Sequence, residues 1–292
     1  GDYHTCVMSN LGQVKCWGDN SVGQLGYDDT LARGGSGTGD MGDSLPDVLI
    51  GPVGVSNAVA LAAGGNVTCV VLRDGEVKCW GDNAYGQLGQ GDTVARGIAE
   101  NQMGKCLPAI SLGQQAKAVA TSGSHTCAIL TDETIRCFGR NNYGQLGQGH
   151  TDDWGDGPGE MGDALPAVDF AGRWARVFED VGGAFDGYSS SYNEVHQAGR
   201  VGGVVLGSAH SCVLLDDNQV VCFGLNDDGQ LGYGDTTPRG GSASSMGDSL
   251  PALDLGRAYI SSSTSTSSIT GTSTTTMTST STHTTTMTST ST

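Results

Sequence analysis

Residues 68–91 read T-C-V-V-L-R-D-G-E-V-K-C-W-G-D-N-A-Y-G-Q-L-G-Q-G, and close copies of this stretch begin near residues 5, 126 and 211. In each copy two cysteines stand ten residues apart, followed by an aromatic residue and the pattern Gly-x-Asn-x-x-Gly-Gln-Leu-Gly. Repetition at intervals of roughly 60 to 85 residues predicts an array in which each unit covers the apolar face of its neighbour.

Each pair of cysteines is predicted to close a β-hairpin. In the second copy, residues 69–72 and 76–79 flank Arg73-Asp74-Gly75, a three-residue loop with glycine at the position that favours positive φ. In this register residue 69 lies directly opposite residue 79, within the range that a disulfide can span. We therefore predict four disulfides, which are Cys6–Cys16, Cys69–Cys79, Cys127–Cys137 and Cys212–Cys222.

Two copies depart from glycine at the third position of the hairpin loop. The fourth copy has Asn218 there, a residue type that tolerates positive φ. The third copy has Glu133, which we expect to strain its turn.

A metal site is the alternative use of these cysteines, because a histidine two residues earlier shares a strand face with the first cysteine. The pairs are His4/Cys6, His125/Cys127 and His210/Cys212. The second copy has Val67 in the histidine position, and a separation of ten residues is not typical of zinc ligands. Disulfides are therefore favoured over metal.

Two further strands are expected in each unit. One follows the sequence Met-Gly-x-x-Leu-Pro, and one precedes the next cysteine pair. The first kind covers residues 45–50, 107–112, 165–170 and 250–255, and the second covers residues 58–62, 117–121 and 203–206. With 48 glycines for turns, this pattern predicts an all-β fold, a β-propeller-like array of four four-stranded units.

The predicted domain boundaries follow the repeats. A repeat domain covers residues 1–260, and a low-complexity tail rich in Ser and Thr covers residues 262–292. Within the repeat domain the expected units are 1–57, 58–116, 117–202 with an insert at 173–200, and 203–256, followed by a closing or donated strand at 257–261.

The phrase H-T-C-x-x-x-x-x-G-x-V-x-C-W-G-x-N-x-x-G-Q-L-G resembles the regulator of chromosome condensation repeat, in its cysteine-paired, secreted-type version. The resemblance covers nearly all of residues 1–260 and implies a β-propeller, which in this family is a seven-bladed ring. The founding member is a chromatin-bound nucleotide exchange factor. That activity is not carried over, because this chain is acidic and its cysteines are paired. One fold hosts many functions.

Both ends of the array depart from a closed ring. The first unit lacks a leading strand, since Gly1-Asp2-Tyr3-His4 directly precedes its first cysteine. Conversely, Arg257-Ala258-Tyr259-Ile260-Ser261 aligns with the leading strand at 117–121 but has no unit after it. We favour completion of the first unit of a second copy by this strand, which repeats into a filament. Closure within one chain and a truncated larger propeller are the alternatives.

The insert at 173–200 is a candidate partner-binding loop, because it places aromatic side chains among Gly and Ser. These residues are Trp174, Phe178, Phe185, Tyr188 and Tyr192. A loop that folds its aromatic side chains onto its own unit is the equally weighted alternative.

The tail is expected to be disordered and O-glycosylated, because a stretch of almost only Ser and Thr cannot form a core. The run T-T-T-M-T-S-T-S-T occurs twice, and the candidate attachment sites are Thr274, Thr275, Thr276, Thr284, Thr285 and Thr286. An unmodified tether is the alternative. Asn66-Val67-Thr68 is the N-glycosylation sequon, with Asn66 as acceptor, usable only in the secretory route.

No catalytic motif, cofactor motif or membrane-spanning run is found in the sequence, so an enzyme is not expected. A formal charge of −17 disfavours nucleic acid as a partner. The acidic loops are potential Ca²⁺ ligands but lack a recognised spacing, and solvated charge is favoured. Cys106 is left over, as a buried thiol or a bridge between subunits.

From these features we expect a non-enzymatic, extracellular or cell-surface glycoprotein that self-associates into a fibre or coat. In that interpretation the subunits join head-to-tail through the terminal strand and the tail. The alternative is a monomeric secreted propeller that binds a protein or carbohydrate through the insert.

Overall fold

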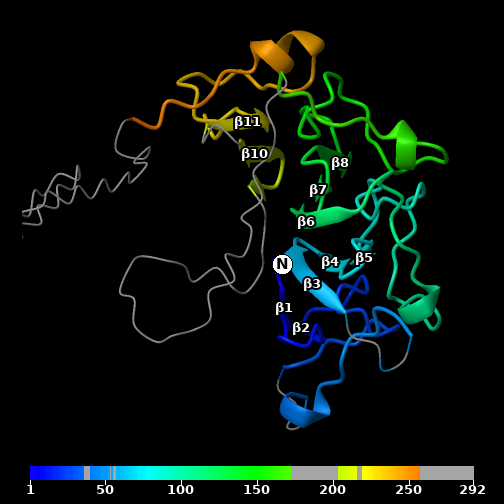
Figure 1. Ribbon diagram of the computed structural model, residues 1–292. Helices are drawn as coiled ribbons and strands as arrows, with labels where there is room; N and C mark the ends of the chain where they lie inside the picture. The colour runs from blue at the N-terminus through cyan, green and yellow to red at the C-terminus, as the bar shows by residue number, and fades with distance from the viewer. Residues whose placement is uncertain (36–39, 53, 55–56, 172–202, 216–218, 257–292) are drawn as a thin grey trace, which may run out of the picture. The chain divides into compact units, whose positions relative to one another are not determined.

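A computed structural model describes residues 1–35, 40–52, 54, 57–171, 203–215 and 219–256 (Figure 1). Residues up to Leu253 form one compact unit, and residues 254–292 form a second one. The predictions for Asn218, for the insert with its five aromatic residues, for the strand at 257–261 and for the Ser/Thr tail with its six candidate threonines lie outside the described residues.

The described fold consists of short strands and 3₁₀ turns. In chain order they are β1 (His4–Met8), β2 (Val14–Gly18), η1 (Gly42–Ser44), β3 (Ala58–Gly64), β4 (Val67–Leu72), β5 (Val77–Gly81), η2 (Gly104–Cys106), β6 (Ala116–Thr121), β7 (His125–Leu130), β8 (Ile135–Gly139), η3 (Gly162–Ala164), β9 (Val204–Leu206), β10 (His210–Leu214), β11 (Val220–Gly224), η4 (Ala243–Ser245) and η5 (Gly247–Ser249).

The strands form four antiparallel sheets, one in each repeat unit. Three sheets have three strands, in the orders β3-β4-β5, β6-β7-β8 and β9-β10-β11, whereas the first sheet contains only β1 and β2. The first unit therefore lacks a leading strand among the described residues, as the sequence predicted. All-β architecture with one sheet per repeat is confirmed.

The hairpins have the register that the loop length predicts. Cys69 lies opposite Cys79, and the equivalent cysteines of the other three units are paired in the same way. Leu72 and Glu76 form a hydrogen-bonded pair of the hairpin. Because hydrogen-bonded and non-hydrogen-bonded pairs alternate, Cys69 and Cys79 form a non-hydrogen-bonded pair, the type with the shorter Cα–Cα distance. The Cα atoms of each bonded pair are 4.1 Å apart, slightly closer than expected, and all four pairs are joined by disulfides.

The hairpin loops show how their third residue matters. Gly12 and Gly75 adopt φ of 78° and 85°, and Glu133 occupies the same left-handed region at 67°. A side chain in that region crowds its own backbone and costs about 1 kcal/mol or more. The carboxylate of Glu133 lies 3.5 Å from the ammonium of Lys117, an exposed ion pair that offsets little of this cost.

The strand expected after Leu-Pro is wrong in every unit. Residues 45–50, 107–112, 165–170 and 250–255 contain no strand. Each segment makes one backbone hydrogen bond to the hairpin, for example from Ile110 N to Val77 O at 2.8 Å. Pro108 and its equivalents have no N–H to donate, so a second rung of the ladder is missing. The described units thus have two strands in the first unit and three in each of the others, with an extended segment beside the last strand.

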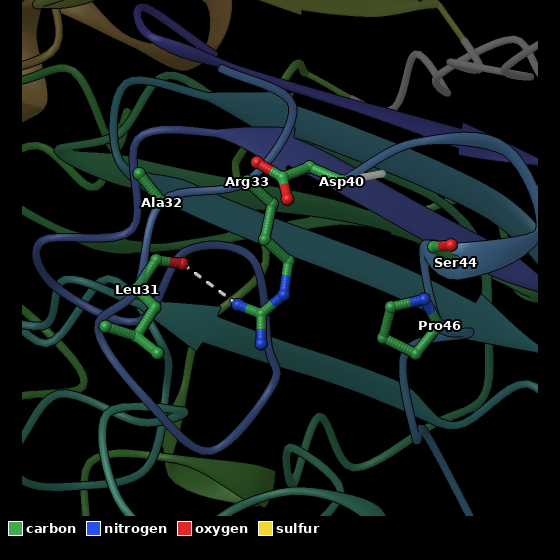
Figure 2. A pocket seen from close by; sticks show the side chains of 6 residues that line it. All are labelled: Leu31, Ala32, Arg33, Asp40, Ser44 and Pro46. Carbon is green, nitrogen blue, oxygen red and sulfur yellow. Dashed lines mark hydrogen bonds between the residues drawn. The ribbon is translucent and has the colours of Figure 1, made fainter. Parts of the chain in front are cut away.

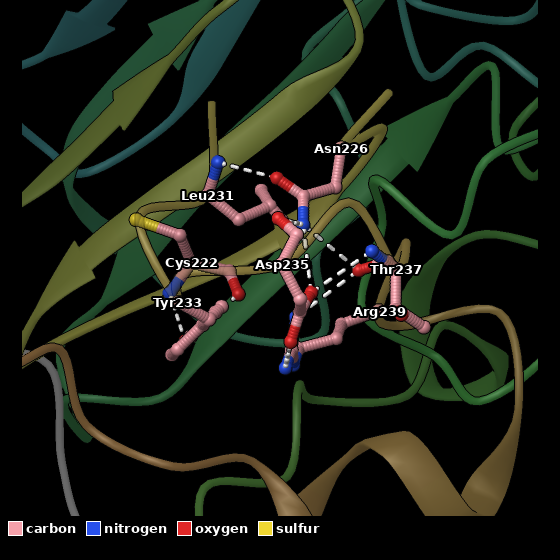
Figure 3. Close-up of polar contacts among 7 residues, drawn as sticks. All are labelled: Cys222, Asn226, Leu231, Tyr233, Asp235, Thr237 and Arg239. Carbon is pink, nitrogen blue, oxygen red and sulfur yellow. Dashed lines mark hydrogen bonds and ion pairs between the residues drawn. The ribbon is translucent and has the colours of Figure 1, made fainter. Parts of the chain in front are cut away.

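The turn after each hairpin is held by a buried asparagine, drawn for the fourth unit in Figure 3. Asn226 accepts a hydrogen bond from Leu231 N at 2.9 Å and donates to the carbonyl oxygens of Asp235 and Thr237. Arg239 pairs with the carboxylate of Asp235 at 2.9 Å and lies over the ring of Tyr233. Asn20, Asn83 and Asn141 play the same part in the other units.

The hydrophobic core consists of three clusters, each of which contains side chains of two consecutive units. One cluster joins Leu25 of the first unit to Val70 and Trp80 of the second, and two further clusters join the second unit to the third and the third to the fourth. Strand contacts follow the same order: β1 lies against β3, β3 and β4 against β6, and β6 and β7 against β9. Each sheet is therefore packed on the next one in sequence.

We predict that Glu133→Gly stabilises the protein by about 1 kcal/mol, because glycine adopts the observed φ without crowding. The free energy of unfolding, measured with urea, tests this. Gly75→Ala is the matched control and should destabilise, since a Cβ there would lie 2.6 Å from the Cβ of Gln115. A Glu133→Gly variant no more stable than wild type would contradict strain in this turn.

Candidate functional site

A shallow pocket of about 240 Å³ lies at the first unit, lined by Leu31, Ala32, Arg33, Asp40, Ser44 and Pro46 (Figure 2). Its one cation, Arg33, is bound to Asp29 at 2.7 Å and also donates to Leu31 O. Hydrogen bonding to Asp29 raises the pKa of Arg33, and the same bond lowers the pKa of Asp29. These groups hold the loop in place, so the pocket carries no evident chemistry.

The described residues provide neither a cluster of metal ligands nor a membrane-spanning helix. No group of three or more His, Cys, Asp or Glu is arranged to hold a metal ion in the part of the chain that the structure describes. In that same part, no helix has the length and apolar character needed to cross a bilayer.

The chemically organised part of the molecule is the interface between consecutive units. A hydroxyl on the residue before the first cysteine donates to the backbone carbonyl of the glutamine in the preceding Gly-Gln-Leu-Gly turn. The pairs are Thr68 to Gln24 at 2.8 Å, Thr126 to Gln87 at 2.9 Å, and Ser211 to Gln145 at 2.8 Å. All six residues are fully buried. We call the hydroxyl side of a unit its leading face and the glutamine side its trailing face.

A histidine completes this contact at two of the three interfaces. His4 Nε2 lies 2.8 Å from Thr68 Oγ1, and His125 Nε2 lies 2.9 Å from Ser211 Oγ. Because each hydroxyl hydrogen points to a glutamine carbonyl, Nε2 must carry the proton that joins ring to hydroxyl. The histidine thus belongs to the trailing face, and the arrangement assigns it a hydrogen-bonding role in place of the metal alternative.

Burial keeps these histidines neutral. Desolvation lowers the pKa of His125 to about 3, helped by the nearby ring of His210. It also lowers the pKa of His4 to about 4. Protonation of either ring would place a charge inside a unit interface.

The second interface dispenses with histidine. Val67 stands in the histidine position, and the hydroxyl oxygens of Thr126 and Thr121 lie 3.1 Å apart. Here the side chain of Gln87 reaches across to Gly123 O at 3.0 Å. All three interfaces therefore contain the hydrogen bond from hydroxyl to carbonyl, and only two of them also contain the histidine.

Glycines of the trailing face admit the next unit at very short range. A Cβ added at Gly26 would lie 2.6 Å from Trp80 Nε1, whose N–H donates to Gln24 O at 3.1 Å. Gly89 and Gly147 receive Phe138 and Phe223 in the same way, each at 2.8 Å. The aromatic residue after the second cysteine thus packs on the glycine after Gln-Leu in the preceding unit.

One strand edge is open in the described structure. Ser9 N bonds to Gln13 O, so by alternation Cys6 and Met8 point their backbone groups away from β2. In the second unit the equivalent Cys69 is paired with Ala62 of β3. Within the described residues no strand covers this edge of β1, which is a template for strand addition.

Other predicted site residues fall within the framework. Thr68 of the sequon is buried in the first interface, and the side chain of Asn66 accepts from Gln24 at 3.4 Å. The sequon threonine therefore has a structural use, and attachment of a glycan at Asn66 stays a prediction. Cys106 is exposed and unbonded, so the buried-thiol alternative is wrong and the bridging one stays untested.

The interface contacts were not found by the sequence reasoning. The signal was present, since every copy has Thr or Ser before its first cysteine and Gln within Gly-Gln-Leu-Gly. Both features were interpreted within one unit, as parts of a hairpin and a turn. Their partners lie in different units, which the single-unit pattern does not place together.

Comparison with known proteins identifies the repeat. A family model described as the Regulator of chromosome condensation (RCC1) repeat matches residues 1–24, 58–87, 116–145 and 203–230, and a second model of the same description matches residues 74–129. The matched segments contain the hairpins, the glycine-rich turns and, beyond the first unit, the leading strands.

Several known proteins resemble the whole array. The Ultraviolet-B receptor UVR8 of Arabidopsis thaliana is 27% identical over 266 residues, covering 82% of this chain and 55% of UVR8. The human E3 ubiquitin-protein ligase HERC2 is 28% identical over 257 residues, covering 81% of this chain and 5% of HERC2. Human WBSCR16 superposes with a TM-score of 0.52 at 16% identity, covering 86% of this chain and 50% of that one, and shows the fold alone. The chain therefore spans about half the length of UVR8.

We predict that Thr126→Val lowers the free energy of unfolding by about 1–3 kcal/mol, because the buried carbonyl of Gln87 then has no partner. Valine keeps the shape of threonine, so the effect isolates the hydroxyl. Thr5→Val is the matched control, measured in dilute protein: Thr5 is the equivalent residue of the first unit but is exposed within the chain, and loss of its hydroxyl should change the stability of the single chain little. Equal effects in the two variants would contradict the importance of the interface hydroxyl.

Acid should weaken the array through its histidines. The pKa of His125 is lower in the fold than its ordinary value near 6.5, so its contribution to stability is complete above pH 6.5 and is lost as pH falls toward 3. At pH 5 the loss is about 2 kcal/mol. Urea unfolding at pH 7.5 and pH 5 measures it, and His125→Gln should show a smaller loss. An unchanged pH dependence in that variant would refute this assignment.

Proposed function

Because the chain belongs to the regulator of chromosome condensation repeat proteins, we propose that it acts by binding proteins and not by catalysis. The buried polar groups of the interfaces are engaged in joining repeats. A scaffold of this kind presents edges and loops to partners. The finer proposal is a structural role, as the repeating subunit of an extracellular fibre or coat.

The open edge of β1 is the observation that carries this proposal. A row of unpaired backbone groups accepts a further strand, and natural proteins rarely leave such an edge uncovered. In the third unit, Ala120 lies opposite Cys127 and Ala118 opposite Ile129. Small and apolar residues at alternate positions thus fit the edge beside a disulfide.

The strand that we propose for this edge is residues 257–261 of a second copy. Its sequence, Arg257-Ala258-Tyr259-Ile260-Ser261, aligns with Lys117-Ala118-Val119-Ala120-Thr121 of β6. By this alignment Ala258 would lie opposite Met8, and Ile260 opposite Cys6. A strand donated from the end of one chain to the start of the next repeats without limit unless the rotation closes a ring.

An extracellular location is proposed from chemistry alone. Disulfides persist in oxidising compartments and are rare in the cytosol. Four of them in one repeat domain favour the secretory route. In the same proposal the Ser/Thr tail carries O-linked glycans, which with the charge of −17 would keep an assembled surface hydrated.

We predict that the full chain forms filaments and that a chain ending at Gly256 does not, because the latter lacks the donated strand. Negative-stain electron microscopy of both proteins at matched concentration tests this. Discrete particles in both samples would overturn the fibre. A chain without residues 173–200 is the control and should still form filaments. If all samples contain only discrete particles, and the chain without residues 173–200 no longer binds a protein or carbohydrate that the full chain binds, the result would instead support the monomeric binding module.

A further inference from the structure

The two outer faces of the array carry the same groups that form its three internal interfaces. We propose that the leading face of unit 1 docks on the trailing face of unit 4 of a second copy, so that a fourth interface of the same kind joins the chains. This inference rests on the proposed self-association and names the surfaces and contacts by which it occurs.

The leading face of unit 1 carries the same donor groups as the other leading faces, and no described residue covers these donors. Thr5 stands in the position of Thr68, Thr126 and Ser211, yet its side chain is exposed. Trp17 stands in the position of the fully buried Trp80 but is only half-buried. Within the described residues neither the hydroxyl of Thr5 nor the indole N–H of Trp17 makes a hydrogen bond. Both donors are therefore free to meet the acceptor that their equivalents use.

The trailing face of unit 4 offers the missing acceptor. Gln230 stands in the position of Gln24, Gln87 and Gln145, which are fully buried, whereas Gln230 is half-buried. Its backbone carbonyl accepts no hydrogen bond from any described residue. His210, the equivalent of His4 and His125, is half-buried with no described hydroxyl beside Nε2.

The glycines of this face are open as well. A Cβ added at Gly23, Gly86 or Gly144 would lie 2.2 to 2.8 Å from the backbone of the next unit. At the equivalent Gly229 a Cβ would lie 3.8 Å from the nearest described atom, the carbonyl oxygen of Asp235 in unit 4 itself. Gly232, the equivalent of Gly26, has only a leucine side chain near it and lacks an aromatic ring. Among the described residues, no following unit fills the space beside Gly229 and Gly232.

The proposed contacts follow position by position from the internal interfaces. Thr5 of one chain would donate to the carbonyl of Gln230 in the second copy, and Nε2–H of His210 would donate to the same hydroxyl. Trp17 would pack on Gly232 and donate to Gln230 O, as Trp80 does with Gly26 and Gln24. These contacts bury polar groups that have matched partners, which is the condition for a specific interface.

A second copy, in place of the same chain, is the occupant we commit to. No hydrogen bond between units 1 and 4 is found among the described residues, whereas each pair of consecutive units is joined by several. The contact is heterologous, because different surfaces meet. Such a contact produces either a closed ring of copies or a filament. It also continues an interface that the chain already forms three times.

The test uses the full chain with substitutions at the exposed Thr5. Thr5→Arg should abolish association, and Thr5→Val should weaken it about tenfold or more, since the buried carbonyl of Gln230 would lose one of its two donors and His210 Nε2–H would lose its acceptor. Thr5→Ser should retain association, because Ser211 performs this role in unit 4. Sedimentation velocity over a range of concentrations measures the association constant, and circular dichroism confirms that each variant is folded.

The outcomes separate this inference from the fibre itself. Filaments that persist unchanged in Thr5→Arg would overturn the proposed interface and leave the fibre standing. Closed particles that are lost in Thr5→Arg would support the interface and overturn the fibre. A wild-type chain that stays monomeric at every concentration would overturn both. The Thr5→Arg variant keeps the trailing face of unit 4, so it can still receive a wild-type copy but cannot dock on one. A small amount of this variant mixed into wild-type protein should therefore shorten the assemblies. Assemblies of unchanged length would contradict a heterologous contact.

Discussion

The interaction on which the array depends is the hydrogen bond from a hydroxyl of one unit to a glutamine carbonyl of the unit before it. Gln87 is fully buried, so its backbone carbonyl would cost about 1–3 kcal/mol if left without a donor. Thr126 supplies that donor only when the next unit is correctly placed. The bond therefore fixes the offset between neighbouring sheets, which apolar packing alone would allow to slide.

Glycine makes this bond geometrically accessible. The 48 glycines suggest tight turns, and many of them do adopt positive φ, but the backbone approach between units is a second and separate requirement. At Gly86 a Cβ would lie 2.3 Å from the backbone of Asp156, so even alanine would push the units apart. The aromatic ring that packs on Gly89 can reach it for the same reason. Turn chemistry and unit packing thus select the same residue type.

The sequence predicts those features that depend on contacts within a single unit. Alternation and a three-residue loop fix the hairpin register, which places Cys69 opposite Cys79, and the left-handed position of Glu133 follows from the same loop. The strand after Leu-Pro was predicted wrongly, because an apolar run resembles a strand even where Pro108 removes a donor. The contacts of Thr126 and His125 were missed, because their partners belong to other units and no local pattern pairs them.

The first and third internal interfaces differ from the second in how they respond to acid. The first and third contain a buried neutral histidine, whereas Val67 removes the titrating group from the second. Lowering the pH therefore penalises the outer two interfaces and spares the middle one, so that units 2 and 3 form the part least sensitive to acid. His210 would place a histidine in the contact between copies too. The first and third interfaces and the contact between copies would then all weaken in acid. The interface between units 2 and 3 would not.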